Sequence, residues 1–212
     1  MEKGKYSYMK DFFQNNFDKN TRKNIIYSLC IKICDQIMLE YILSTIKSED
    51  HESNGSGMPY SDLLFFDYIK YKNVSRPKEE EIDIHDVSLK NNGFLIHTAE
   101  RKELALSFIK FNDGNDKLEN NSYEIIKVKP FNIYYVVGRN DHITFGKYFN
   151  KDANLQCKKV IDFSQLLKEC NYNGKHFIDK NNNELNEPFL KEHIDLFFLG
   201  KLLIEFEEDS GS

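Results

Sequence analysis

Six side chains that can hold a metal ion or transfer a proton fall in the middle of the chain. They are His85, Asp86, His97, Glu100, Asp141 and His142. Imidazoles and carboxylates of this kind serve as zinc ligands and as general acids and bases. No two of them have the spacing of a ligand pair, and the intervening sequence places them on separate strands and loops. We therefore expect no metal site, no cofactor and no enzyme activity.

Four cysteines are the other candidates for soft metal ligands or thiol chemistry. Cys30 and Cys34 lie one helical turn apart, but no further Cys or His completes a site around them. There is no CxxC pair, and no secretory signal precedes the cysteines. We interpret all four (Cys30, Cys34, Cys157 and Cys170) as buried free thiols of a reducing compartment. This predicts a nuclear or cytoplasmic protein.

The segment that starts at Asp179 has part of the pattern of a calcium loop. Asp179, Asn181 and Asn183 alternate as the first oxygen ligands of such a loop do. The sixth position of a calcium loop needs Gly and the twelfth a bidentate Glu, whereas this chain has Glu184 and Leu190 there. No calcium binding is expected.

The charge of the chain bears on its partners. The formal net charge is -5 at neutral pH, and the excess of carboxylates lies entirely after residue 57. A phosphate backbone would be repelled on average, and no basic run offsets that repulsion. We expect no nucleic-acid partner.

An unusually apolar helix is predicted near the N-terminus, over residues 24–47. Its polar positions recur about every four residues, so that well over half of its circumference is apolar and must be buried on several sides. Lys32, Asp35 and Glu40 lie within it and make a membrane span too costly. Residues 18–21 supply capping side chains, and a shorter amphipathic stretch over residues 8–17 precedes them.

Residues 54–58 read Asn-Gly-Ser-Gly-Met, and the chain ends in Ser-Gly-Ser. Such Gly-Ser segments are typical of flexible tethers between joined polypeptides. We interpret the chain as a fusion with four parts: a helical partner segment (1–53), an engineered linker (54–57), a β-rich domain (58–209) and a tag remnant (210–212). The alternative is a natural polar loop.

The helical segment is too small to bury its own apolar surface. We expect it to dock on the β-rich domain, as in a heterodimer, or on another copy of the chain. The residues predicted to form this interface are Ile26, Leu29, Ile33, Ile37 and Tyr41.

The remainder of the chain predicts a mainly β fold, an antiparallel β-sandwich. Short apolar runs alternate with Asn- and Gly-rich turns at roughly ten-residue spacing. The charged stretch 76–81 is interpreted as a solvated connector, and residues 61–71 as either a strand or a helix. Helices are expected near 164–170 and 188–195. The expected strands are 82–89, 94–97, 104–111, 123–128, 133–137, 142–145, 160–163, 176–178 and 202–206.

Six short segments of the C-terminal part follow one another in the order and spacing of a known domain. Residues 134–139 read Tyr-Tyr-Val-Val-Gly-Arg and are followed by Asp-His-Ile, and residues 173–179 read Asn-Gly-Lys-His-Phe-Ile-Asp. Leu-Lys at 190–191, Asp-Leu-Phe-Phe-Leu-Gly at 195–200 and an apolar run at 201–206 come next. Together, over about residues 120–208, they resemble the forkhead-associated domain, a β-sandwich that binds phosphothreonine peptides.

This resemblance implies a phosphopeptide site. Arg139 matches the Arg of the family that contacts the phosphopeptide, and Asn173 matches the Asn that holds the peptide backbone. Asn154 and Lys175 stand where the family has its phosphate-binding Ser and a Thr. A guanidinium with neutral donors around it is well suited to a phosphate of nearly two charges.

These observations predict a non-catalytic interaction or scaffold subunit with a divergent forkhead-associated-like domain, stabilised by a helical segment of its partner and able to read phosphothreonine. Two alternatives remain open. One is a small phosphoesterase or metal-dependent enzyme that uses His142, whose His-Ile-Thr context resembles an element of the two-histidine phosphoesterases. The other is a pathogen-encoded inhibitor of a host protein.

Overall fold

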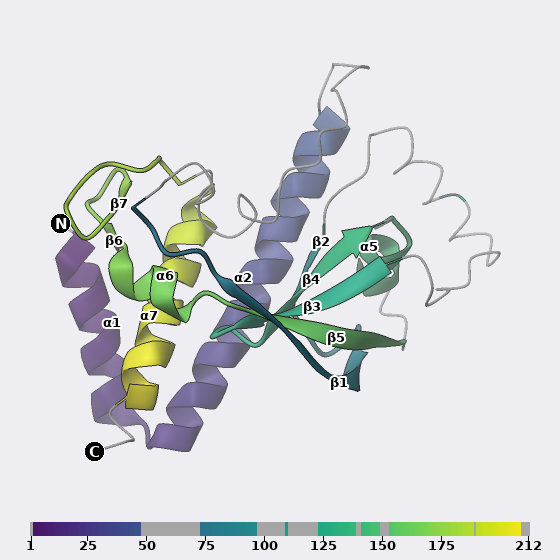
Figure 1. Ribbon diagram of the computed structural model, residues 1–212, viewed down its shortest axis with the longest axis horizontal. Coiled ribbons are helices and arrows are strands. Elements are labelled where there is room, and N and C mark those ends of the chain that lie inside the picture. The colour runs from purple at the N-terminus through teal and green to yellow at the C-terminus, as the bar shows by residue number, and fades with distance from the viewer. Residues whose placement is uncertain are drawn as a thin grey trace.

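A computed structural model describes residues 2–47, 73–96, 123–138, 141–148, 153–188 and 190–208, together with Ile109. These residues form a five-stranded sheet, a two-stranded sheet and a set of helices (Figure 1). The spacer at 54–57, the tag remnant, the element expected at 61–71 and, apart from Ile109, the strand expected at 104–111 lie outside the described residues.

Two helices begin the chain. Helix α1 (Glu2–Asn16) and helix α2 (Lys19–Lys47) match the two predicted helical stretches. Asp18 caps α2, because its Oδ1 accepts hydrogen bonds from the backbone amides of Asn20 at 3.0 Å and Thr21 at 3.1 Å. The predicted capping segment is therefore confirmed.

The main sheet is mixed, and its strand order is β1-β5-β3-β4-β2. Strands β1 and β5 run antiparallel, as do β3 and β4, whereas β2–β4 and β3–β5 are parallel pairs. A separate hairpin forms the small sheet β6-β7. The expectation of an antiparallel sandwich is wrong. The strands are β1 (Lys78–Ser88), β2 (Phe94–Ile96), β3 (Tyr123–Lys129), β4 (Ile133–Gly138), β5 (Asn154–Asp162), β6 (Asn171–Tyr172) and β7 (Phe177–Ile178).

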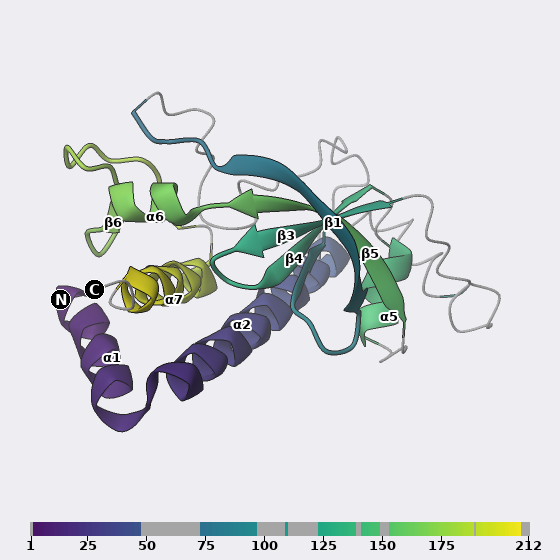
Figure 2. The same ribbon diagram turned by 60° about the horizontal axis from the view of Figure 1, so that its bottom comes forward.

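Both faces of the main sheet are buried at strand β4. Ile133 and Tyr135 belong to a core formed with α2 and the C-terminal helix α7 (Lys191–Glu208), whereas Tyr134 and Val136 belong to a second core. The alternation follows from the two-residue period of a strand. Helices α1, α2 and α7 lie together on one side of the sheet (Figures 1 and 2).

Two expected strands are helices. Residues 142–145 lie in α5 (Asp141–Tyr148), and residues 202–206 lie in α7. Most of α7 is buried on all sides, and a run that is apolar throughout has no period that distinguishes strand from helix. The closing strand expected for a sandwich is thus absent at 202–206. The helix expected near 164–170 is confirmed as α6 (Ser164–Glu169).

A single glycine sets how closely α7 approaches the sheet. A Cβ atom at Gly200 would lie 2.5 Å from Cε1 of Phe131 and 2.9 Å from Cδ1 of Leu167. Phe131 is fully buried in the turn between β3 and β4. No larger residue fits at position 200 without displacing that ring.

Candidate functional site

Of the four residues predicted to bind phosphopeptide, the structure describes three, and it does not gather these three into one site. Asn154 is exposed at the first position of β5, opposite Ser88 of β1. Asn173 and Lys175 lie in the β6-β7 turn, which follows the far end of β5 and α6. The nine residues of β5 alone span about 26 Å. Arg139 lies outside the described residues.

The side chain of Asn173 is engaged in its own turn. Its Oδ1 accepts hydrogen bonds from the backbone amides of Lys175 at 2.9 Å and His176 at 2.8 Å. Gly174, which follows Asn173, has a φ of 104°, a backbone conformation that favours glycine. Lys175 forms an ion pair with Glu187 at 3.2 Å. These contacts stabilise the β6-β7 hairpin, and they occupy the side-chain oxygen Oδ1 of Asn173.

The five residues predicted to form a partner interface lie on α2. Ile26, Ile37 and Tyr41 are buried, and Ile33 packs against the core from a partly buried position. Leu29 is different, since 40% of its surface is exposed. Helix α2 packs against β2, β4 and α7 of this same chain. Most of its apolar surface is therefore covered within the chain, and binding of α2 to another protein stays a prediction.

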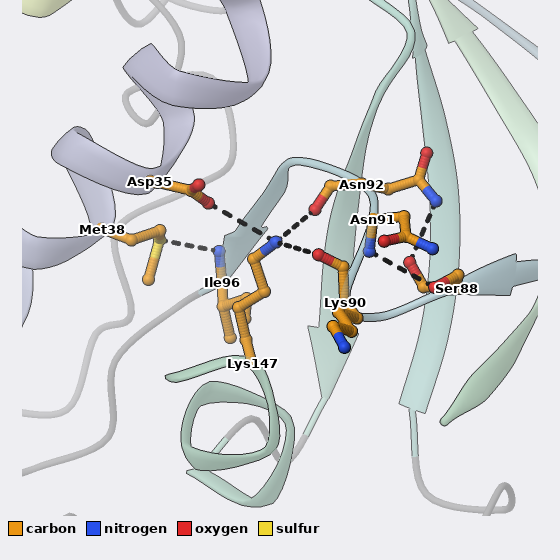
Figure 3. A network of polar contacts seen from close by, with 8 residues as sticks. All are labelled: Asp35, Met38, Ser88, Lys90, Asn91, Asn92, Ile96 and Lys147. Carbon is orange, nitrogen blue, oxygen red and sulfur yellow. Dashed lines mark hydrogen bonds and ion pairs between the residues drawn. The ribbon is translucent and has the colours of Figure 1, made fainter. Parts of the chain in front are cut away.

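Helix α2 also closes one edge of the main sheet, the one formed by β2. The backbone amide of Ile96 donates a hydrogen bond to the sulfur of Met38 at 3.1 Å (Figure 3). A Cβ atom at Gly93, just before β2, would lie 3.0 Å from Cα of Ile31. The backbone of α2 thus lies directly beside the start of β2. At Gly93 and Ile96 the outer side of β2 is therefore covered by the helix.

A lysine from α5 reinforces this closed edge. Lys147 Nζ donates to the carbonyl oxygens of Asn92 at 2.6 Å and Lys90 at 3.3 Å, and lies 3.6 Å from the Asp35 carboxylate of α2 (Figure 3). Only 13% of the Lys147 side chain is exposed. One cation therefore joins α2, α5 and the loop between β1 and β2.

The opposite edge of the sheet is formed by β1, and among the described residues no strand pairs with its outer side. Ten of its eleven residues are exposed or partly exposed, Val87 being the buried one. Ile84 is 60% exposed, which is unusual for a large apolar side chain on a strand. An irregularity in pairing between Glu81 and His85 divides the edge into two shorter stretches.

The register of β1 on β5 shows which backbone groups face outward. The amide of Leu89 donates to the carbonyl of Ala153 at 2.8 Å, directly after the Ser88–Asn154 pair. Hydrogen-bonded and non-hydrogen-bonded pairs alternate in an antiparallel ladder. The backbone groups of Val87 therefore point toward β5, whereas those of Asp86 and Ser88 point toward the outer side.

The sequence pattern predicts part of β1 as a strand but not the position of that strand at an edge of the sheet. The expected strand covers 82–89, and 76–81 is interpreted as a connector, whereas Lys78–Glu81 pair with residues 159–162 of β5. Three consecutive glutamates are unfavourable in a central strand and tolerable at an edge, where charged side chains reach water. The three consecutive glutamates are therefore the feature of the sequence that indicates an edge strand.

The other candidates for chemistry are dispersed. His85 and Asp86 lie on β1, whereas His97, Glu100 and the side chains of Asp141 and His142 lie outside the described residues. Within the described ranges, no three His, Cys, Asp or Glu side chains are placed to hold a metal ion. Over the same ranges, no helix is long and apolar enough to cross a membrane.

All four cysteines are buried as free thiols. Burial raises the pKa of Cys30, Cys34 and Cys170, and that of Cys157 is raised for the same reason. A thiol with a raised pKa carries little thiolate at neutral pH and is a poor nucleophile. The interpretation of these residues as small core hydrophobes agrees with their surroundings.

No curated protein and no solved structure matches the chain. One family model does match, and its match extends on both sides of residues 54–57. The origin of the Gly-Ser spacer stays a prediction. Since the match covers residues 1–210, the chain belongs to the family of unknown function DUF6710.

Proposed function

We propose that this protein is a non-catalytic interaction subunit that binds an extended segment of a partner protein along β1. The observation that supports this is the contrast between the two edges of the main sheet. Helix α2 covers the β2 edge, whereas no described strand pairs with the outer side of β1, which also carries the exposed side chain of Ile84.

Strand addition is the binding mode that such an edge favours. An extended peptide can pair with the outward backbone groups of a strand, which supply affinity, while side chains on the edge select the sequence. On β1 the outward groups include those of Asp86 and Ser88. Proteins normally blunt an open edge with charges, bulges or a covering helix, because it is a template for pairing. β1 has charges and an irregular register but no covering helix among the described residues.

The test is selection of ten-residue peptides from an unbiased displayed library on the full chain. We expect binders whose addition slows amide hydrogen exchange at Asp86 and Ser88 and leaves the amide of Val87 unchanged. Recovery of no binder, or of binders that protect amides elsewhere, would overturn the proposal.

Two controls separate strand pairing from ordinary side-chain contact. Methylation of alternate backbone nitrogens in a selected peptide removes its donors toward β1, and we expect binding to be lost. Asp86→Pro removes one outward donor of the protein while the Val87 pairing with β5 is retained. Binders that tolerate both changes would exclude strand addition.

A further inference from the structure

On the basis of this proposed function, we infer that the segment bound at β1 is a basic strand from another protein and not a second copy of this chain. Strand β1 carries five carboxylates, Glu79, Glu80, Glu81, Asp83 and Asp86, against a single lysine. All five lie at exposed positions. Charge complementarity therefore selects lysine and arginine in the bound strand.

The carboxylates occupy both faces of the edge. Successive side chains of a strand point to opposite faces, so that Glu80 lies on the face opposite to Glu79 and Glu81. A strand added beside β1 meets carboxylates on whichever face its own side chains point to. Directly opposed unlike charges stabilise a strand pair, and like charges destabilise it. Basic side chains are thus favoured on both faces of the bound strand, that is, at successive positions of its sequence.

Neighbouring cations balance only part of this charge. Lys159 of β5 lies opposite Glu81 in the register and forms an ion pair with Glu124 of β3 at 2.8 Å. Lys78 begins β1, and His85 is turned toward the carbonyl of Asp83, with Nδ1 at 3.3 Å. Glu80, Asp83 and Asp86 remain as the acidic groups that an incoming basic strand would meet.

The same features oppose pairing between two copies of this edge. Five carboxylates on each strand would face one another, and the irregular register between Glu81 and His85 interrupts regular pairing on both strands. A partner segment without an irregularity of its own meets this interruption once, as β5 does, because β5 pairs with β1 on both sides of it.

The peptide library described above also tests this inference. We expect selected peptides to be enriched in lysine and arginine, and their affinity to fall about tenfold between low salt and 0.5 M salt, since exposed pairs are screened. The double variant Glu80→Lys/Asp83→Lys should lose these binders and select acidic peptides instead. Glu40→Lys, at an exposed position of α2, is the matched control and should bind as the unmodified protein does.

The outcomes separate the two proposals. Neutral or acidic binders that protect Asp86 and Ser88 would overturn the inference and leave strand addition standing. Absence of any binder at β1 would overturn strand addition itself. Dimers seen by sedimentation and removed by Asp86→Pro would show that the occupant is a second copy, again overturning the inference.

Discussion

The sulfur of Met38 accepts a hydrogen bond from the backbone amide of Ile96 at 3.1 Å, and this contact ties α2 to the last residue of β2. Both residues are buried, with exposed fractions of 2% and 1%. An amide at a sheet edge normally faces water or another strand. Here the Ile96 amide donates instead to the thioether of Met38, which is a weak acceptor.

Met38→Ala should destabilise the protein by about 2–5 kcal/mol, because it removes a buried side chain and leaves a cavity between α2 and β2. Met38→Leu keeps the volume and removes only the acceptor, for which we expect about 1 kcal/mol. Urea unfolding measures both. Faster exchange of the Ile96 amide in the Leu variant would show that the sulfur is its partner, and unchanged exchange would contradict this.

Replacement of Ile37 by Ala should cost about 2–5 kcal/mol of unfolding free energy, because Ile37 is fully buried between α2 and the rest of this chain. Leu39 lies two residues away and is 44% exposed. Leu39→Ala is the matched control, and we expect a change within about 0.5 kcal/mol. Equal effects of the two substitutions would mean that α2 does not pack on the sheet in solution as it does here.

The two sides of the spacer can be separated directly. With a protease site inserted between Gly55 and Gly57, we expect the cleaved chain to elute as one species in gel filtration, because α2 remains buried against β2, β4 and α7. Two independent species after cleavage would show that this packing is too weak to hold the parts together.

Asn173 offers a test of phosphothreonine binding against a purely structural role. Asn173→Ala removes the oxygen that accepts from Lys175 and His176, and should cost about 0.5–1.5 kcal/mol of stability. Asn173→Asp keeps that oxygen and should retain most of the stability. If Asn173 instead contacts a phosphopeptide, the added negative charge should weaken binding of a phosphothreonine peptide at least as much as Ala does.

Glu169 provides a pH-dependent contribution to stability. Its pKa lies below the ordinary value, chiefly because Gln165 Nε2 donates to its carboxylate at 2.8 Å, with further donation from the amide and hydroxyl of Ser75. A carboxylate whose folded pKa is depressed binds protons less tightly in the folded state than in the unfolded state. Its stabilising contribution is present above the unfolded value of about 4.3 and is lost as pH falls through the folded pKa.

Glu169→Gln should therefore be less stable than the unmodified protein at pH 6, and the difference should shrink as pH falls below about 4. Unfolding free energies measured between pH 3 and pH 6 give this difference directly. A gap that stays constant over the range would show that Glu169 contributes no proton-linked stability.

The sequence by itself determined the elements whose period or capping is unambiguous. The polar positions of α2 repeat at helical spacing, Asp18 is a strong capping residue, and the alternating runs of β3 and β4 were placed within a residue of their ends. These signals are local, because they arise from side chains within a few positions of one another. They required no knowledge of what each element packs against.

Only the tertiary structure decided the identity of α7 and the edges of the sheet. A continuous apolar run is buried equally well as a central strand or an enclosed helix, and the choice at 202–206 depends on α1, α2 and α6 around it. In the same way, nothing local to Asn154 and Asn173 shows that the first lies on the main sheet and the second in the turn of the small one. Whether β1 lies at an edge depends on the order in which distant strands pair, and that order is set by the packing of both sheet faces as a whole.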